Sequence, residues 1–166
     1  ATHIILPGVG SFFQGMTNLN EMHITEQIKE QVFVKEKPVL GVCLGMQMLA
    51  AKGTEGCEIS GLGFIDGIVE LMVQKDPAEK IPHVGWNNVI HSSDDPLFNG
   101  IPSGKDFYFV HSYHMKCNNE SDIIGRTKYC GEIVSAVHKG SVWGTQFHPE
   151  KSQRMGFQIL KNFLAV

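Results

Sequence analysis

The sequence predicts a doubly wound α/β fold, in which a mostly parallel sheet lies between two layers of helices. Apolar runs typical of buried strands occur at residues 2–6 and 39–42. Helical residues follow each run, roughly over 24–36 and over 44–52, and an amphipathic helix closes the chain. Because strands that alternate with helices form parallel sheets, we expect the ligand site at the carboxyl edge of the sheet.

The middle of the chain is richer in strand-forming residues and is divided by prolines. Short β-branched and aromatic runs predict strands at 107–110, 123–126, 133–137 and 142–147. The closing helix is expected to bury one face at i, i+3, i+6, i+7 spacing, which carries Phe157, Leu160, Phe163 and Leu164.

Cys43 stands where a predicted strand meets the next helix, with Gly41 and Gly45 on either side. Small residues at these positions allow a sharp strand–turn–helix elbow that presents the side chain at the edge of the sheet. The following helix would direct its first N–H groups and its positive dipole end at the sulfur. We therefore expect Cys43 to be a nucleophile with a lowered thiol pKa.

A nucleophilic thiol needs a partner that accepts and returns a proton, and His148 follows the predicted strand 142–147. The spacing of His148 and Glu150 keeps both side chains on one side of an extended segment, so that Glu150 can orient the imidazole. Singly, each residue could be structural, since buried cysteines and satisfied histidines are common. Together they predict a Cys-His-Glu triad.

These motifs, at 41–47 and 146–150, resemble those of class I (triad-type) glutamine amidotransferases. The likeness runs through nearly the whole chain and is closest to the glutaminase subunits of imidazole glycerol phosphate synthase, which act in histidine biosynthesis. It extends to segments 6–12, 82–87, 108–113 and 151–152. The resemblance implies one flavodoxin-like amidotransferase domain over 1–166 that lacks the first βαβ portion, roughly thirty to forty residues.

The loop at residues 7–10 follows a predicted buried strand and has accessible backbone N–H groups. It could complete an oxyanion hole or cradle a phosphate, but a Gly-x-Gly without a Gly-Lys-Ser/Thr motif is weak evidence for phosphate. The resemblance implies an oxyanion hole, and glutamine-binding residues besides, with no cofactor. The oxyanion residues are Val9, Gly10 and Leu44, and the glutamine-binding residues are Gly8, Gln47, Ser112 and Tyr113.

The resemblance also implies a partner, a (β/α)₈ cyclase subunit that consumes the ammonia released from L-glutamine. Trp86 could instead be a core residue, as aromatic residues in strands usually are. The residues expected at the subunit interface or ammonia passage are Trp86, Asn87, Tyr108 and Lys151.

Composition excludes several other classes of protein. A net charge of −3 leaves no basic stripe for nucleic acid, and the apolar stretches are too short to span a membrane. Four scattered cysteines without a Cys-x-x-Cys pair favour a reducing cytoplasm. A metal site is disfavoured, because His111 and His114 would point to opposite faces of a strand, with His83 and His91 far upstream.

Two rival functions remain from the sequence. The first is a glutaminase of the same fold that supplies another synthase, such as one that aminates a surface-sugar precursor. The second is a cysteine hydrolase or a catalytically silent interaction module, in which Cys43 would be a structural or redox-sensing thiol.

Overall fold

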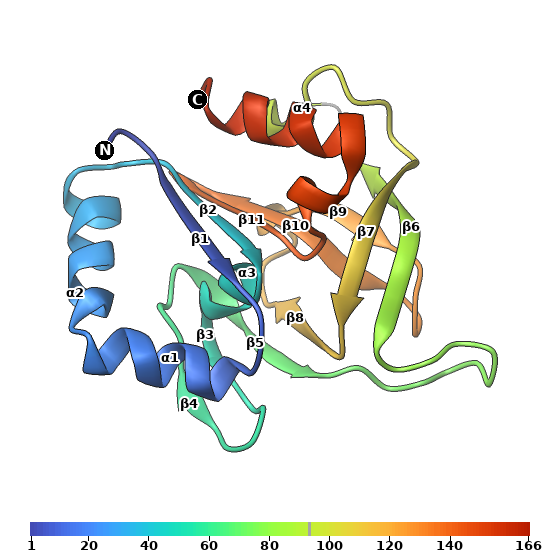
Figure 1. The fold of residues 1–166 in the computed structure, drawn as a ribbon, viewed down its shortest axis with the longest axis horizontal. Coiled ribbons are helices and arrows are strands. Elements are labelled where there is room, and N and C mark those ends of the chain that lie inside the picture. The colour runs from blue at the N-terminus through green and yellow to red at the C-terminus, as the bar shows by residue number, and fades with distance from the viewer. Residues whose placement is uncertain (93) are drawn as a thin grey trace.

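The computed structural model describes residues 1–92 and 94–166 and has a central seven-stranded sheet with helices on both faces (Figure 1). At one end of this sheet β1, β2 and β11 are parallel, whereas the remaining neighbouring strands of the same sheet pair antiparallel. In order across the sheet the strands are β1 (Ile4–Gly8), β2 (Val39–Cys43), β11 (Val142–Thr145), β10 (Ile133–Lys139), β9 (Ile123–Thr127), β6 (His83–His91) and β7 (Lys105–His111).

The α/β fold class is thus confirmed, but the expectation of a mostly parallel sheet is wrong. The reason is the short connections in the second half of the chain. Only Gly140 and Ser141 join β10 to β11, and a two-residue turn permits antiparallel pairing alone.

Helices cover both faces of this sheet and bury two separate apolar cores. Side chains of α1 (Phe12–Glu21), α2 (Ile24–Lys29), the π-turn Glu30–Val34 and α3 (Leu44–Met48) share one core. On the opposite face, α4 (Gln153–Phe163) packs beside the 3₁₀ turn Pro96–Phe98. Further 3₁₀ turns span Glu120–Asp122 and Pro149–Lys151. The sheet edge that carries the strand-to-helix junctions therefore lies between the two helical layers.

Helix α1 was not expected as an element of its own. Ser11 caps it, since the Ser11 hydroxyl accepts a hydrogen bond from the N–H of Gln14 at 3.2 Å. The helix buries its own side chains Phe12 and Met16. A serine followed three residues later by glutamine is a capping signal that the sequence does contain.

The helix predicted over 44–52 is shorter than expected, because α3 ends at Met48 and residues Ala50–Gly53 form strand β3. A smaller sheet forms there, and Gly53 packs so closely under Phe12 that a Cβ on the glycine would lie 2.6 Å from the ring. Tertiary pairing has overridden helix propensity here. The strand order of this smaller sheet is β4 (Ile59–Ser60), β3, β5 (Ile65–Leu71) and β8 (Tyr113–Cys117).

The predicted buried face of the closing helix is right for Phe163, which is fully buried, and for Leu160, which packs against the core. It is wrong for Phe157 and Leu164, which are 65% and 60% exposed, and it omitted the fully buried Ile159. Gly156 sets the rotation of α4, because a Cβ at this position would lie 1.8 Å from the carbonyl oxygen of Pro149. The helix therefore packs through its glycine against the turn that follows His148.

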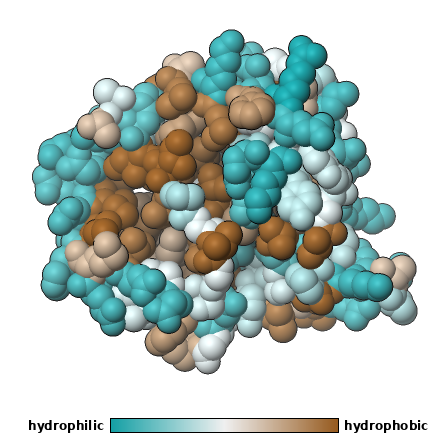
Figure 2. All heavy atoms as spheres, viewed as in Figure 1, coloured by the Kyte–Doolittle hydropathy of each residue, from teal (hydrophilic) through white to brown (hydrophobic). Residues whose placement is uncertain are grey.

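Strand β1 lies at one edge of the main sheet, and apolar side chains gather on the face of the molecule that carries it (Figures 1 and 2). Ile5 and Val9 are among the exposed apolar residues of this segment. None of the described helices is long and apolar enough to cross a membrane.

Candidate active site

Cys43 occupies a strained turn between β2 and α3. Its backbone has φ 55° and ψ −109°, a conformation that a residue with a side chain rarely adopts. A Cβ on Gly41 would lie 2.6 Å from the backbone of Gly45, which explains why a glycine is needed before the turn. The predicted elbow is present, with its sulfur at the carboxyl end of β2.

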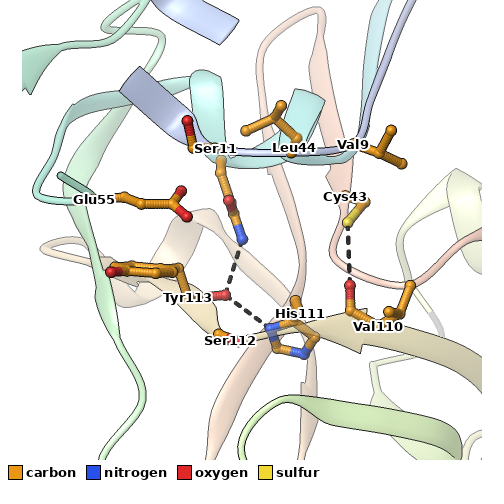
Figure 3. A pocket seen from close by; sticks show the side chains of 11 residues that line it. Val9, Ser11, Cys43, Leu44, Glu55, Val110, His111, Ser112 and Tyr113 are labelled. Carbon is orange, nitrogen blue, oxygen red and sulfur yellow. Dashed lines mark hydrogen bonds between the residues drawn. The ribbon is translucent and has the colours of Figure 1, made fainter. Parts of the chain in front are cut away.

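The elbow opens into a cavity of about 400 Å³ (Figure 3). The loop after β1, the start of α3, the loop after β3 and the β7–β8 turn supply its walls. Six of the seven residues expected to contact the oxyanion or glutamine line this cavity, namely Val9, Gly10, Leu44, Gln47, Ser112 and Tyr113.

The seventh, Gly8, lines a neighbouring cavity of about 230 Å³ together with His148 and Glu150. The two cavities share Val9. Gly8 lies opposite Cys43 in the pairing of β1 with β2, so the end of β1 adjoins both the thiol and the cavity that His148 lines.

His148 and Glu150 form a hydrogen-bonded pair, with 2.7 Å between Nδ1 and the carboxylate oxygen Oε1. Because the carboxylate can only accept, Nδ1 carries a proton, and a general base at this position would use the lone pair of Nε2. This Nε2 is buried and has no hydrogen-bond partner among the described residues. A buried, oriented and unsatisfied ring nitrogen is suited to take a proton from a reacting group.

Backbone hydrogen bonds fix the position of His148. Its N–H donates to the carbonyl of Tyr108 at 2.9 Å, and the Ser152 hydroxyl donates to the His148 carbonyl at 2.6 Å. Ser152 also accepts from the N–H of Tyr108 at 2.9 Å. Strand β7 therefore holds the histidine turn in place.

Adjacent parallel strands bring the cysteine and histidine segments to the same edge, since Thr145 of β11 pairs with Val42 of β2. The hydrogen-bond contacts of the thiol, however, are with residues other than His148. Cys43 Sγ lies 3.8 Å from the carbonyl oxygen of Val110, as Figure 3 shows, and 3.8 Å from Nε2 of Gln146.

The expectation of a lowered thiol pKa is wrong for this state of the protein. Burial raises the pKa of Cys43 to about 11, and the nearby charge of Glu150 adds to the rise. The N–H of Leu44 and the charge of Lys151 oppose it without overcoming it. Helix α3 has five residues, so its dipole is weak compared with the cost of removing a thiolate from water.

Sequence reasoning missed two polar residues of the site. Gln146 is fully buried, and its amide donates to Cys43 Sγ while its Oε1 accepts from Gln47 Nε2 at 3.1 Å. A glutamine inside an otherwise apolar strand run was the available signal. Glu55 lines the cavity and accepts from the N–H of Phe12 at 2.7 Å, but it comes from a loop with no recognisable pattern.

Three of the four residues expected at a subunit interface lie together on the surface. The rings of Trp86 and Tyr108 are 6.0 Å apart between centroids, and Lys151 Nζ lies 5.9 Å from the Tyr108 centroid. Trp86 is 48% exposed, so the alternative that it is a core residue is wrong. Asn87, the fourth, is half-buried and directs its amide toward the carbonyl of Lys128 at 3.4 Å.

The histidines considered as metal ligands have other roles. Within residues 1–92 and 94–166 no group of three metal-ligating side chains comes together. His83 and His111 instead lie 3.1 Å apart between Nδ1 and Nε2, and His91 stacks on Phe98.

Comparison with known proteins gives a match over residues 1–166 to the family described as glutamine amidotransferase class-I. The chain belongs to this family. The class I amidotransferase assignment expected from the sequence is therefore confirmed, and with it the class of enzyme.

Among amidotransferases, the chain is similar to the imidazole glycerol phosphate synthase subunit HisH 1 of Campylobacter jejuni, at 47% identity over 98% of this chain and 80% of that protein. It is 42% identical to the HisH subunit of Bradyrhizobium diazoefficiens, over 99% of this chain and 78% of that protein. The solved structure of a putative GMP synthase subunit from Thermoplasma acidophilum has a similar fold, with a TM-score of 0.70, 21% identity, and coverage of 99% of this chain and 71% of that one.

Proposed function

We propose that this amidotransferase is the glutaminase subunit of imidazole glycerol phosphate synthase and hydrolyses L-glutamine to glutamate and ammonia. The observation that carries the chemistry is the placement of the Cys43 elbow and the His148–Glu150 pair at the ends of adjacent strands. The identity of the synthase rests on the HisH relatives.

In the first half of the reaction, Cys43 sulfur attacks the side-chain carbonyl carbon of glutamine. The oxygen of that carbonyl becomes an oxyanion, which backbone N–H groups of Leu44 and of the Val9–Gly10 loop stabilise from within the cavity. His148 Nε2 takes the thiol proton and delivers it to the amide nitrogen, so that ammonia leaves and a γ-glutamyl thioester remains.

In the second half, water attacks the thioester carbonyl. His148 accepts a proton from this water and returns it to the sulfur as the C–S bond breaks, which releases glutamate. Glu150 keeps Nδ1 protonated throughout and stabilises the imidazolium that forms at each transfer.

The substrate's amino-acid group is held at the far wall of the cavity. The carboxylate of Glu55 matches the α-ammonium, and the backbone N–H groups at Ser112 and Tyr113 match the α-carboxylate. Gln47 supports this wall, because its Nε2 donates to the carbonyl of Tyr113 at 2.9 Å.

The partner in this proposal is a (β/α)₈ cyclase subunit that docks in the cytoplasm on the cluster of Trp86, Tyr108 and Lys151. This cluster adjoins the triad directly, since Lys151 follows Glu150 and the Tyr108 carbonyl accepts from the His148 N–H. A resting thiol with a pKa of about 11 is almost fully protonated at neutral pH. Because Tyr108 holds the His148 backbone, we expect partner contact at this cluster to move His148 toward the thiol, so that the thiol can lose its proton and activity rises.

The test is glutamate release from glutamine, measured with and without the cyclase subunit and its nucleotide substrate, with Cys43→Ala as the blank. Activity that depends on Cys43 and rises with the loaded cyclase supports the proposal. Activity indifferent to the cyclase would assign the glutaminase to another synthase, and its absence in all conditions would indicate a silent module.

A further inference from the structure

Two buried histidines face each other behind the glutamine cavity. His83 on β6 and His111 on β7 are directly opposite in the antiparallel pairing of these strands, and both are almost fully buried. The ring of His83 is stacked between Phe109 and Tyr129, with centroid distances of 4.7 Å and 3.8 Å. The catalytic steps above use neither histidine.

The hydrogen bonds of this pair can run in one direction only. His111 Nδ1 lies 2.8 Å from the carbonyl oxygen of Tyr113, which can only accept, so Nδ1 must be the donor (Figure 3). In a neutral ring, His111 Nε2 is then an acceptor, and His83 Nδ1 must donate to it across 3.1 Å. His83 Nε2 accepts in turn from the amide of Asn87 at 3.4 Å.

The chain of donors ends on the wall of the cavity. The Tyr113 carbonyl accepts hydrogen bonds from both His111 Nδ1 and Gln47 Nε2. Residues 111–113 form the bend between β7 and β8. The bend supplies His111, Ser112 and Tyr113 to the cavity lining. These two hydrogen bonds tie the carboxyl end of the bend to His111 and Gln47, and so restrict how the backbone of Ser112 and Tyr113 can turn at the cavity wall.

We propose that His83 and His111 are a positioning pair that fixes the bend 111–113 in its glutamine-binding conformation and so sets the affinity for the substrate's amino-acid group. The proposal rests on the glutaminase function proposed above. It predicts an effect on substrate binding and none on the reactivity of the Cys43 thiol.

The surroundings keep both rings neutral, as this direction of hydrogen bonding requires. Burial lowers the pKa of His111 to about 3 and the pKa of His83 to about 4. Glu79 opposes the effect at His83, while His114 and His148 add to it at His111. A second proton on His111 would sit on Nε2 and face the N–H of His83, and a second proton on His83 would sit on Nε2 and face the Asn87 amide, so the pair holds position and transfers no proton at neutral pH.

The test uses two substitutions of His83, one that keeps an aromatic ring and one that keeps an N–H donor. His83→Phe keeps an aromatic ring between Phe109 and Tyr129 but removes the donor to His111. His83→Asn loses the ring but keeps an amide N–H near the position of Nδ1. Each variant is treated with a chloroketone analogue of glutamine, which needs the amino-acid site, and with iodoacetamide, which needs only the thiol.

We expect His83→Phe to slow chloroketone labelling of Cys43 and raise the KM for glutamine by about tenfold, the effect of one lost hydrogen bond. Its iodoacetamide rate and kcat should stay near those of the unaltered chain, and His83→Asn should recover most of the loss. Equal chloroketone rates in all three proteins, or a parallel fall in iodoacetamide rate, would overturn the positioning role. Failure of the unaltered chain to react with the chloroketone would instead overturn the proposed function.

A second measurement needs no variant to fold. Nitrogen-15 NMR of the unaltered protein should show both His83 and His111 as Nδ1–H tautomers, unchanged down to about pH 5. An Nε2–H tautomer at His111 would contradict the hydrogen-bond direction on which the proposal depends.

Discussion

Gly45 lies so close to Leu6 that a Cβ atom on the glycine would sit 1.7 Å from the Leu6 carbonyl oxygen. Helix α3 therefore meets strand β1 backbone to backbone. This contact brings the first turn of α3 against the loop that follows β1, and the two halves of the proposed oxyanion hole lie on these two segments.

Gly45→Ala should separate these segments and destabilise the protein by about 3 kcal/mol, because the clashing atom is backbone and cannot rotate away. Urea unfolding measures the loss. Gly56→Ala is the matched control, since its Cβ would meet nothing within 4 Å and only its positive φ of 83° opposes the change, at a cost of about 1 kcal/mol. Equal losses in both variants would contradict the close contact.

The ionisation of Cys43 gives a second prediction. With a pKa of about 11, the rate at which iodoacetamide alkylates Cys43 should keep rising through pH 9 and 10 without reaching a plateau. Peptide mapping separates this site from the other three cysteines. A plateau reached near pH 7 would mean that the helix terminus outweighs burial after all.

His148 and Glu150 should differ in their importance for catalysis. His148→Asn removes the group that carries the proton and should lower kcat for glutamine hydrolysis by about a thousandfold or more. Glu150→Ala should cost less, because Glu150 orients the ring and its side chain is 52% exposed, so that water can replace it. If both variants retained normal turnover, His148 would not be the base.

Glu55 provides a test of substrate recognition that is independent of the triad. Glu55→Gln keeps an oxygen that can accept from the Phe12 N–H, so the melting temperature should hardly change. It removes the charge opposite the proposed α-ammonium, which should raise the KM for glutamine by about tenfold with little change in kcat. An unchanged KM would remove Glu55 from the binding site.

His138 and Asp95 should make stability depend on pH. His138 Nδ1 lies 2.5 Å from the Asp95 carboxylate and Nε2 lies 2.8 Å from the Gly140 carbonyl, so both nitrogens face acceptors. Burial alone would lower the pKa of His138, but these hydrogen bonds outweigh burial and raise it. The stabilisation is therefore fully present below the unfolded pKa of about 6.5 and is lost as pH rises through the folded value.

His138→Gln measures this contribution. The difference in free energy of unfolding between the two proteins should be largest near pH 6, at roughly 1–2 kcal/mol, and should shrink toward pH 9. A difference that stays constant over this range would show that the imidazolium does not contribute.

The sequence predicted those parts of the site whose residues carry a backbone requirement. Gly41 and Gly45 specify the elbow, because a Cβ at either position would clash with the backbone, and Cys43 holds the positive φ between them. The short spacing of His148 and Glu150 likewise leads directly to their observed hydrogen bond. Motifs of this kind are local, so the sequence contains them completely.

Features set by long-range packing were not predictable in the same way. Ala50–Gly53 pairs with β5 rather than continuing α3, and Gly156 rotates α4 by its contact with Pro149. The pKa of Cys43 was predicted in the wrong direction because burial of the thiol depends on every element around it. The His83–His111 pair joins strands 28 residues apart, and spacing along one strand cannot reveal it.

The most direct test of the account is to quench the protein with acid during glutamine turnover and measure its intact mass. We predict a mass increase equal to one γ-glutamyl group, which peptide mapping places on Cys43 and which is absent from Cys43→Ala. Steady release of glutamate with no such adduct, and with undiminished activity in Cys43→Ala, would contradict the cysteine mechanism.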